Sequence, residues 1–209
     1  MTADAAAVVF IVDDDPSVRK GLARLVRAAG YDAETYASAR ELLERAQPSG
    51  PCCVVLDVRM PGLSGLELQA ALAAAGRRWS IVFVTGYGDV PVSVNAMKGG
   101  AVDFLTKPVG KRELLGAIER AVTKSREMQQ RDARTAEIQD LIKTLTAREV
   151  EVFALVVTGM LNKQIAAELG VGEKMVKVHR GRVMAKMRAG SLAELVRLAD
   201  EGGVIAPHA

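Results

Sequence analysis

The stretch Val8-Val9-Phe10-Ile11-Val12-Asp13-Asp14-Asp15 decides the fold, because a short apolar run ends there in three carboxylates. Three further apolar runs also lead into polar residues: residues 54–56 into Asp57, 81–84 into Thr85, and 101–105 toward Lys107. Open α/β folds bind their ligands at the carboxyl ends of parallel strands. If these runs are neighbouring strands, carboxylates, a hydroxyl and an ammonium converge at one edge of a sheet. Such a set is typical of phosphoryl transfer.

Residues 8 to about 124 alternate apolar, strand-like runs with amphipathic helical stretches, which indicates βα units and a parallel sheet. Five units can be counted. We expect strands over residues 8–12, 31–36, 52–56, 81–85 and 101–105. We expect helices over residues 16–29, 38–46, 66–75 and 90–98, and a last helix from about residue 111. The first domain is therefore predicted to be α/β.

Length and composition favour two globular domains. The chain has 209 residues, 25% of them charged, and a net charge of only +3. The two cysteines, Cys52 and Cys53, are adjacent and point to opposite faces of a strand, so we interpret them as reduced. No apolar stretch approaches the roughly 20 residues that cross a bilayer. We therefore expect a cytoplasmic protein with no membrane partner.

The strand pattern ends after residue 124. Residues 125–143 are charged and rich in helix-forming residues, which predicts a helical linker continuing the preceding helix. Thr146-Ala147-Arg148-Glu149 matches a capping box and marks the start of a second domain, residues 144–209. Helical periodicity over residues 146–157, 162–169, 173–187 and 191–200 predicts that this domain is all-α.

The second domain carries a local concentration of basic residues. Residues 162–169, the turn Gly170-Val171-Gly172 and the next helix form a helix-turn-helix pattern, whose second helix enters the DNA major groove. No acidic residue interrupts the basic stretch, which holds Lys174, Lys177, Arg180, Arg182, Lys186 and Arg188. Met175, Val176, Val183, Met184 and Met187 fall at core spacing, so we expect them to be packing residues. The absence of aromatic residues on this helix favours duplex over single-stranded DNA.

Asp57 is the predicted nucleophile of the acidic site, because an aspartate can accept a phosphoryl group when a cation offsets the incoming charge. Mg²⁺ prefers oxygen ligands, which Asp13, Asp14 and Asp57 could supply. Lys107 would pair with the phosphoryl oxygens, and Thr85 could donate a hydrogen bond to one of them. A simpler reading remains open, in which Asp13–Asp15 only cap the following helix; for Asp15 we expect capping.

Residues 1–124 resemble a two-component receiver domain. The motifs that carry the resemblance are Val12-Asp13-Asp14, Asp57-Val58-Arg59-Met60-Pro61-Gly62, Val84-Thr85-Gly86-Tyr87-Gly88-Asp89-Val90 and Lys107-Pro108. The resemblance implies a five-stranded, doubly wound parallel sheet of CheY-like, flavodoxin-like topology with strand order 2-1-3-4-5. It also implies that a histidine kinase phosphorylates Asp57, that the backbone carbonyl of Arg59 joins Asp13 and Asp14 at Mg²⁺, and that the Lys107–Pro108 bond is cis.

The same resemblance implies a switch. Thr85 would move toward the phosphoryl group while Phe104 changes rotamer; the alternative for Phe104 is plain sheet core. The phosphorylated receiver would then form a homodimer through its fourth helix and fifth strand, here residues 90–105. Val90, Val94 and Met97 are the candidates for that face, with packing against the sheet as the alternative.

Residues 145–200 resemble a LuxR/NarL-type helix-turn-helix domain, and the whole chain resembles a FixJ-type response regulator. The matching segments are 145–149, 159–166, 176–180 and 191–196. The resemblance places DNA contacts at Lys163, Lys174, Lys177, Val178, His179, Arg180 and Arg182. Base reading is assigned to Lys177 and Val178, while His179 could instead be buried against a neighbouring helix. Gly172, Met175 and Gly181 depart from the family pattern, so DNA specificity cannot be transferred.

These features predict a transcriptional regulator activated by phosphorylation, with a histidine kinase, promoter DNA and RNA polymerase as partners. It is not expected to be an enzyme beyond its own phosphorylation and slow dephosphorylation. A phosphatase of the haloacid dehalogenase type is disfavoured, because that chemistry needs an Asp two residues after the nucleophile and Arg59 stands there. A second alternative is a DNA-binding regulator with a pseudo-receiver that is not phosphorylated.

Overall fold

The computed structural model describes residues 7–86 and 90–204. Tyr87, Gly88 and Asp89 of the receiver motif lie outside the described residues. The chain divides into two compact units, Met1–Gln129 and Gln130–Ala209. Within the described ranges no helix combines the length and the apolar character needed to cross a membrane.

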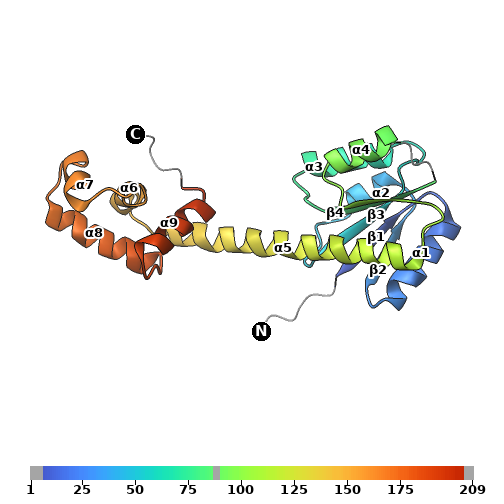
Figure 1. Ribbon diagram of the computed structural model, residues 1–209, viewed down its shortest axis with the longest axis horizontal. Coiled ribbons are helices and arrows are strands. Elements are labelled where there is room, and N and C mark those ends of the chain that lie inside the picture. Colours follow the sequence, from blue (N-terminus) through green and yellow to red (C-terminus); the bar gives the residue numbers. More distant parts are fainter. Residues whose placement is uncertain (1–6, 87–89, 205–209) are drawn as a thin grey trace. The chain divides into compact units, whose positions relative to one another are not determined.

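The first unit contains the predicted parallel sheet (Figure 1). Its strands are Val8–Val12 (β1), Asp32–Tyr36 (β2), Cys52–Leu56 (β3), Ser80–Thr85 (β4) and Asp103–Thr106 (β5). All four pairings are parallel, in the order β2-β1-β3-β4-β5, which confirms the predicted fold. The central strands β3 and β4 are buried along their whole length, as expected for strands covered on both faces.

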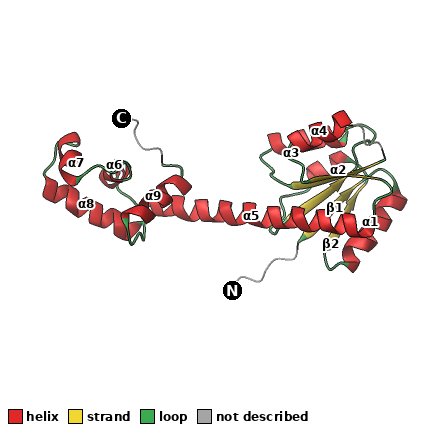
Figure 2. Ribbon diagram, viewed as in Figure 1, coloured by secondary structure: helices red, strands yellow, loops and turns green. Residues whose placement is uncertain are grey.

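Helices cover both faces of this sheet (Figure 2). They are Pro16–Ala28 (α1), Ala39–Glu44 (α2), Gly65–Ala74 (α3), Val90–Lys98 (α4) and the first part of Lys111–Lys143 (α5). One core lies between the sheet and α2, α3 and α4, and contains Phe10 and Phe83. The other lies between the sheet and α1 and α5, and contains Ile11 and Ile118. Because successive side chains of a strand point to opposite faces of the sheet, each strand can contribute residues to both cores.

Local capping positions the helices that follow the site strands. The Asp15 side chain accepts hydrogen bonds from the backbone amides of Ser17 and Val18, so Asp15 is the N-cap of α1 as expected. Ser64 and Glu67 form a full capping box at the start of α3. Ser38 is the N-cap of α2, where its hydroxyl accepts a hydrogen bond from the Glu41 amide. The sequence therefore determines where each helix leaves the edge of the sheet.

Strand β5 begins at Asp103, two residues later than the predicted start at Ala101. The Ala101 amide still donates to the carbonyl of Ala96 and thus closes the end of α4. Gly100 allows that closure because its φ of 91° is readily accessible to glycine. Hydropathy assigned Ala101 to the strand, but its amide closes the end of α4, whereas the amide of Val102 already donates to the carbonyl of Ile81 in β4.

Helix α5 is continuous from Lys111 to Lys143, and the predicted linker, residues 125–143, divides between the two units. In the first unit the Ser125 hydroxyl accepts a hydrogen bond from the Cys52 amide at 3.0 Å. In the second unit Ile138 is completely buried and packs in the helical core.

Cys52 and Cys53 are free and buried, as expected, and burial raises the pKa of the Cys52 thiol to about 11.

The second unit is all-α, as predicted. After the end of α5 its helices are Ala147–Val156 (α6), Asn162–Glu168 (α7), Glu173–Lys186 (α8) and Leu192–Glu201 (α9). Thr146 and Glu149 form the predicted capping box of α6. Phe153, Ile165, Val183 and Leu195 are each fully buried and bring one residue from each helix into a single core. The glycine turn between α7 and α8 fits the helix-turn-helix pattern.

Candidate functional site

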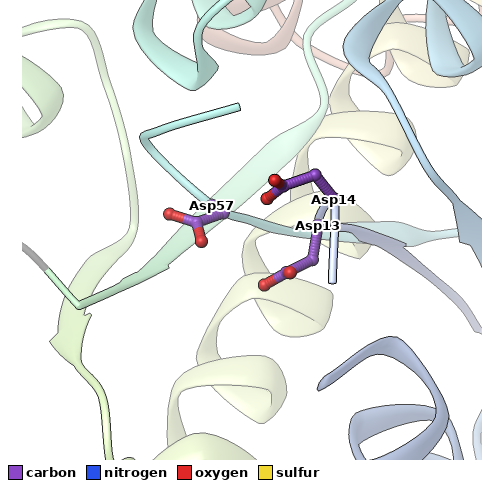
Figure 3. A group of neighbouring side chains, drawn as sticks. All are labelled: Asp13, Asp14 and Asp57. Atoms are coloured by element: carbon purple, nitrogen blue, oxygen red, sulfur yellow. The ribbon is translucent and has the colours of Figure 1, made fainter. Parts of the chain in front are cut away.

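The acidic site lies where β1 and β3 end side by side. Val12 and Leu56 are register partners in the parallel ladder, so the residues that follow them emerge next to each other. The Asp57 amide donates to the Val12 carbonyl at 2.9 Å and extends this pairing. Carboxylate oxygens of Asp13, Asp14 and Asp57 lie within 4.8 Å of one another, and Figure 3 shows the three side chains grouped together. The structure thus brings the predicted carboxylates into one acidic pocket.

These carboxylates differ in their exposure. Asp13 is 2% exposed and Asp57 8%, whereas Asp14 is open to solvent. The amide of Asp15 donates to the Asp13 carboxylate at 2.9 Å, and the amide of Arg59 donates to the Asp57 carboxylate at 3.1 Å. Backbone donors therefore orient the two buried carboxylates, and Asp14 remains at the entrance.

Lys107 bridges the two buried carboxylates. Its Nζ lies 2.6 Å from Oδ2 of Asp13 and 2.6 Å from Oδ2 of Asp57. Burial by itself would lower the pKa of Lys107, but the hydrogen bonds to Asp13 and Asp57 outweigh it and the pKa is raised. The ammonium is therefore charged at neutral pH and offsets the negative charge of the pocket. The Lys107–Pro108 bond is cis, as the resemblance implied.

Thr85 and Phe104 lie on the two strands beside the acidic pocket. Thr85 ends β4, is completely buried, and its carbonyl accepts a hydrogen bond from the Lys107 amide at 2.8 Å. Phe104 in β5 is partly buried, and its ring centroid lies 6.1 Å from that of Phe83. Phe104 therefore contacts the core without being enclosed by it, which leaves its role in a switch a prediction.

Gly65 is a residue of the site that sequence reasoning missed. It begins α3, and a Cβ built on it would lie 2.2 Å from the backbone oxygen of Asp57. The Gly65 amide also donates to the carbonyl of Val58 at 2.9 Å. The start of α3 therefore rests directly on the backbone of the central aspartate. The Ser-Gly pair before an apolar helix was the available signal, but it indicated only a turn.

The predicted face on α4 is apolar and open. Val90 is 75% exposed, Val94 42% and Met97 47%. The alternative, that these residues pack against the sheet, is wrong for these three side chains. Ala96 on the same helix is fully buried and supplies the packing. The face is therefore available to a partner, although its use remains a prediction.

The predicted DNA contacts mostly lie on the surface of α7 and α8. Lys163, Lys174, Lys177, Val178 and Arg182 are exposed. Arg180 is partly buried, and its Nη1 donates to the Asn162 side chain at 3.1 Å, which joins α8 to α7. His179 is also partly buried, and its Nδ1 has no hydrogen-bond partner in the described part of the chain. These two side chains are less open to DNA than the other predicted contacts.

Three details of the basic helix differ from expectation. Met175 was predicted to be a packing residue but is 51% exposed, because Val176 fills the core from this turn of α8. Arg188 lies beyond the end of α8. Lys186 is held in the domain, with its Nζ 2.6 Å from Glu149 and 2.9 Å from the carbonyl of Thr144. The exposed basic residues of α8 itself are therefore Lys174, Lys177 and Arg182.

Two family models match the chain, one for each unit. Residues 9–119 match the response regulator receiver domain. Residues 143–199 match the bacterial regulatory proteins of the luxR family. The two matches cover the predicted receiver and the predicted helix-turn-helix domain.

Similar proteins match over nearly the whole chain. Nodulation protein W of Bradyrhizobium diazoefficiens is 48% identical over 206 residues, 99% of this chain and 91% of that protein. Response regulator protein TodT of Pseudomonas putida is 42% identical, covering 94% of this chain and 87% of that protein. Transcriptional regulatory protein FixJ of Azorhizobium caulinodans is 41% identical, covering 94% and 93%. Both units are therefore shared with proteins of this kind.

Two solved structures of response regulators resemble this chain over nearly its whole length. Response regulator StyR has 46% identity and a TM-score of 0.81, covering 94% of this chain and all of that chain. Full-length FixJ from B. japonicum has 36% identity and a TM-score of 0.56, covering 97% of this chain and all of that chain. With its acidic pocket and its helix-turn-helix, the chain belongs to the two-component response regulators that join a receiver domain to a LuxR-type DNA-binding domain and regulate transcription.

Proposed function

We propose that phosphorylation of Asp57 by a histidine kinase activates this regulator for binding to promoter DNA. The main support is the position of the Lys107 ammonium, 2.6 Å from both buried carboxylates at the carboxyl edge of the sheet. An isolated Asp after a strand has no such partner in general. An ammonium held beside the phosphoacceptor carboxylate can pair with the oxygens of an incoming phosphoryl dianion.

The acidic pocket fits a hard divalent cation. Three carboxylates supply oxygen ligands within 4.8 Å of one another, and Mg²⁺ is usually held by one or two carboxylates with water and phosphate oxygens. Asp13, Asp14 and Asp57, with the backbone carbonyl of Arg59, are the proposed ligands. Bound there, Mg²⁺ would neutralise charge on the transferring phosphoryl group.

The chain's own residues carry the transfer. A carboxylate oxygen of Asp57 attacks the phosphorus of a phosphohistidine, a P–O bond forms, and the P–N bond breaks as the imidazole leaves and takes a proton. Lys107 pairs with the phosphoryl oxygens as charge moves onto them. The backbone amide of Arg59 donates to the Asp57 carboxylate and keeps the nucleophile oriented. No substrate is turned over repeatedly, so the receiver is a switch and not an enzyme in the ordinary sense.

A phosphoryl group adds about −1.5 to −2 charge beside Thr85 and Lys107. In the proposed switch the Thr85 hydroxyl turns to this group and Phe104 changes rotamer, so that the surface near α4 and β5 is altered. Val90, Val94 and Met97 then form a homodimer face. Dimerisation places two helix-turn-helix domains on paired half-sites, where Lys163, Lys174, Lys177, Val178, His179, Arg180 and Arg182 contact DNA.

RNA polymerase is the further partner of a regulator that acts at promoters. Because its DNA target lies in the bacterial cytoplasm, that is the proposed location.

Phosphotransfer tests the proposed function. The full chain is incubated with Mg²⁺ and a small phosphodonor, and phosphate incorporation is measured by intact mass. We expect one phosphate on the wild-type chain and none on Asp57→Asn. Asp15→Asn is the matched control, because Asp15 only caps α1 and should leave incorporation intact. Incorporation into Asp57→Asn at the wild-type level would refute the role of Asp57, and no incorporation into the wild type would favour a pseudo-receiver.

A further inference from the structure

A second pocket, the distal pocket, lies at the edge of the sheet opposite the acidic pocket. It is lined by Trp79, Ser80 and Ile81, where β4 begins, whereas the acidic pocket lies where the strands end. Its other described walls come from α3, the turn after α4 and α5, all within the first unit. Its volume is about 230 Å³, and a dry cavity of about 150 Å³ can already hold benzene. The distal pocket is therefore large enough for one small organic molecule.

The α3 side of the distal pocket is apolar and held in place. Leu72, Trp79 and Ile81 line it and are buried in the core that the sheet shares with α3. The Trp79 indole nitrogen donates to the Gln47 side chain at 2.8 Å, and the Arg77 guanidinium lies 5.3 Å from the centre of a Trp79 ring. This apolar wall is formed before a ligand arrives, which lowers the entropic cost of binding.

The α5 side of the distal pocket carries polar groups. Val82 and Val84 of β4 pack in the core between the sheet and α5, and Ser80, two residues before Val82, points to the same face. Lys124 of α5 also lines the pocket. Ser80 is 2% exposed, and its hydroxyl has no hydrogen-bond partner within the described part of the chain. Because a buried hydroxyl without a partner is unfavourable, this donor suits a polar atom of a bound molecule.

Charge identifies the ligand as an anion. Arg78 and Lys124 are exposed residues of the lining, and none of the described lining residues is acidic. The carbonyls at the end of α4 are already engaged: that of Gly100 accepts from Lys124 Nζ at 3.4 Å, and those of Ala96 and Met97 accept backbone amides. Positive charge therefore dominates at the distal pocket, which favours an anion over a cation.

We propose that the distal pocket binds a small organic carboxylate whose apolar body is about the size of one ring. The carboxylate pairs with Lys124 and accepts a hydrogen bond from the Ser80 hydroxyl, while the apolar body packs against Leu72 and Trp79. An inorganic anion would leave the apolar wall uncovered, and a hydrocarbon would leave the hydroxyl without a partner. Binding uses none of the residues of the acidic pocket, so it does not need a phosphorylated Asp57.

The chain has a single tryptophan, Trp79, and it lines the distal pocket. Its fluorescence is followed while the full chain is titrated with cyclohexanecarboxylate, and isothermal titration calorimetry gives the affinity independently. Cyclohexanecarboxamide has the same shape without the charge, and acetate has the charge without the ring. We expect saturable binding of cyclohexanecarboxylate, binding of the carboxamide about fivefold weaker through loss of exposed ion pairing, and no saturation with acetate over the same concentrations.

A filled pocket locates the binding. Ala73 is an exposed residue of α3 that lines the distal pocket, so Ala73→Leu should abolish binding of cyclohexanecarboxylate. Ala74→Leu is the matched control, because Ala74 is the next exposed residue of α3 and is not part of the lining. It should bind as tightly as the wild type. Circular dichroism checks that both variants are folded, and both should still incorporate phosphate at Asp57.

Two further variants test the orientation of the carboxylate. Lys124→Met should weaken binding of cyclohexanecarboxylate about fivefold and leave that of the carboxamide unchanged. Ser80→Ala removes a hydrogen bond to a charged group and should weaken binding of the carboxylate about tenfold. Unchanged carboxylate affinity in both variants overturns the assignment of the carboxylate to these two side chains.

The remaining outcomes decide the proposal itself. Absence of saturable binding of cyclohexanecarboxylate to the folded wild type overturns it. Equal affinities for the carboxylate and the carboxamide overturn the choice of an anion. Binding to Ala73→Leu at wild-type strength places the ligand elsewhere and overturns the site. Asp57→Asn should bind as the wild type does, so these results stand apart from those of phosphotransfer.

Discussion

Substitution of Gly65 by alanine should disable the acidic site without touching any of its polar side chains. The added Cβ would lie 2.2 Å from the Asp57 backbone oxygen, 3.1 Å from its carbonyl carbon and 3.1 Å from Cε1 of Phe83. Carbon and oxygen atoms approach to about 3.3 Å at closest, so the start of α3 and the Asp57 backbone must separate by about 1 Å. Phe83 is fully buried and leaves little room for the displacement.

Two measurements follow from this displacement. Overpacking of this kind costs about 1–3 kcal/mol, so the first unit should unfold at a lower temperature, by at least about 3 °C. A misplacement of about 1 Å can cost roughly 100-fold in rate, so phosphorylation of Asp57 by a small phosphodonor with Mg²⁺ should slow to that extent. Rates are read by intact mass over time, and unfolding by circular dichroism.

Gly21→Ala is the control, because Gly21 is an exposed residue of α1 and a Cβ there would meet nothing within 4 Å. That variant should keep the wild-type rate, and its unfolding temperature should be unchanged or slightly higher, since alanine favours helix over glycine. A Gly65→Ala protein that matches the wild type in both rate and unfolding temperature would refute the reasoning.

Three further predictions concern single side chains. Lys107→Met removes the ammonium between two buried carboxylates and should slow phosphorylation by a small phosphodonor about 100-fold or more; an unchanged rate would contradict the role given to Lys107. The pKa of Glu149 is lowered from 4.5 to about 2, first by the hydrogen bond from Lys186, so its contribution to stability is complete above about pH 4.5 and is lost as the pH falls toward 2. Thermal unfolding of Glu149→Gln and the wild type should therefore differ at pH 6 and converge near pH 2, whereas a gap that persists at pH 2 would exclude this cause. Phe153→Ala should destabilise the second unit by about 3–5 kcal/mol in denaturant unfolding, and Val150→Ala by well under half of that; equal losses would show that the buried ring does not anchor this core.

The acidic site could be predicted from sequence because strand ends are simple to locate. A buried parallel strand is a short apolar run, and the residue after it lies at a defined edge, so Asp13, Asp57 and Thr85 followed from hydropathy alone. The position of the Lys107 ammonium between Asp13 and Asp57 agrees with this placement at the edge of the sheet. Gly65 did not follow, since its role depends on a contact between two backbones that no residue pattern encodes.

The helix-turn-helix domain shows a different limit. Helical spacing placed both Met175 and Val176 near the core side of α8, but helices pack one narrow face, and Val176 occupies it while Met175 does not. In the same way the start of β5 was set by the backbone closure of α4 rather than by the apolar residue Ala101. Periodicity predicts that an element exists more reliably than it predicts its ends or the edge of its buried face.

The coupling of phosphorylation to DNA binding is the central claim, and one binding measurement tests it directly. A duplex that the full chain binds is first selected from a random pool, and fluorescence anisotropy then gives the affinity of the full chain for it, with Mg²⁺, before and after treatment with a small phosphodonor. Wild-type protein should bind at least tenfold more tightly after treatment, a coupling of about 1.4 kcal/mol, while Asp57→Asn should bind equally in both conditions. Equal affinity of the wild type before and after stoichiometric phosphorylation would contradict the claim.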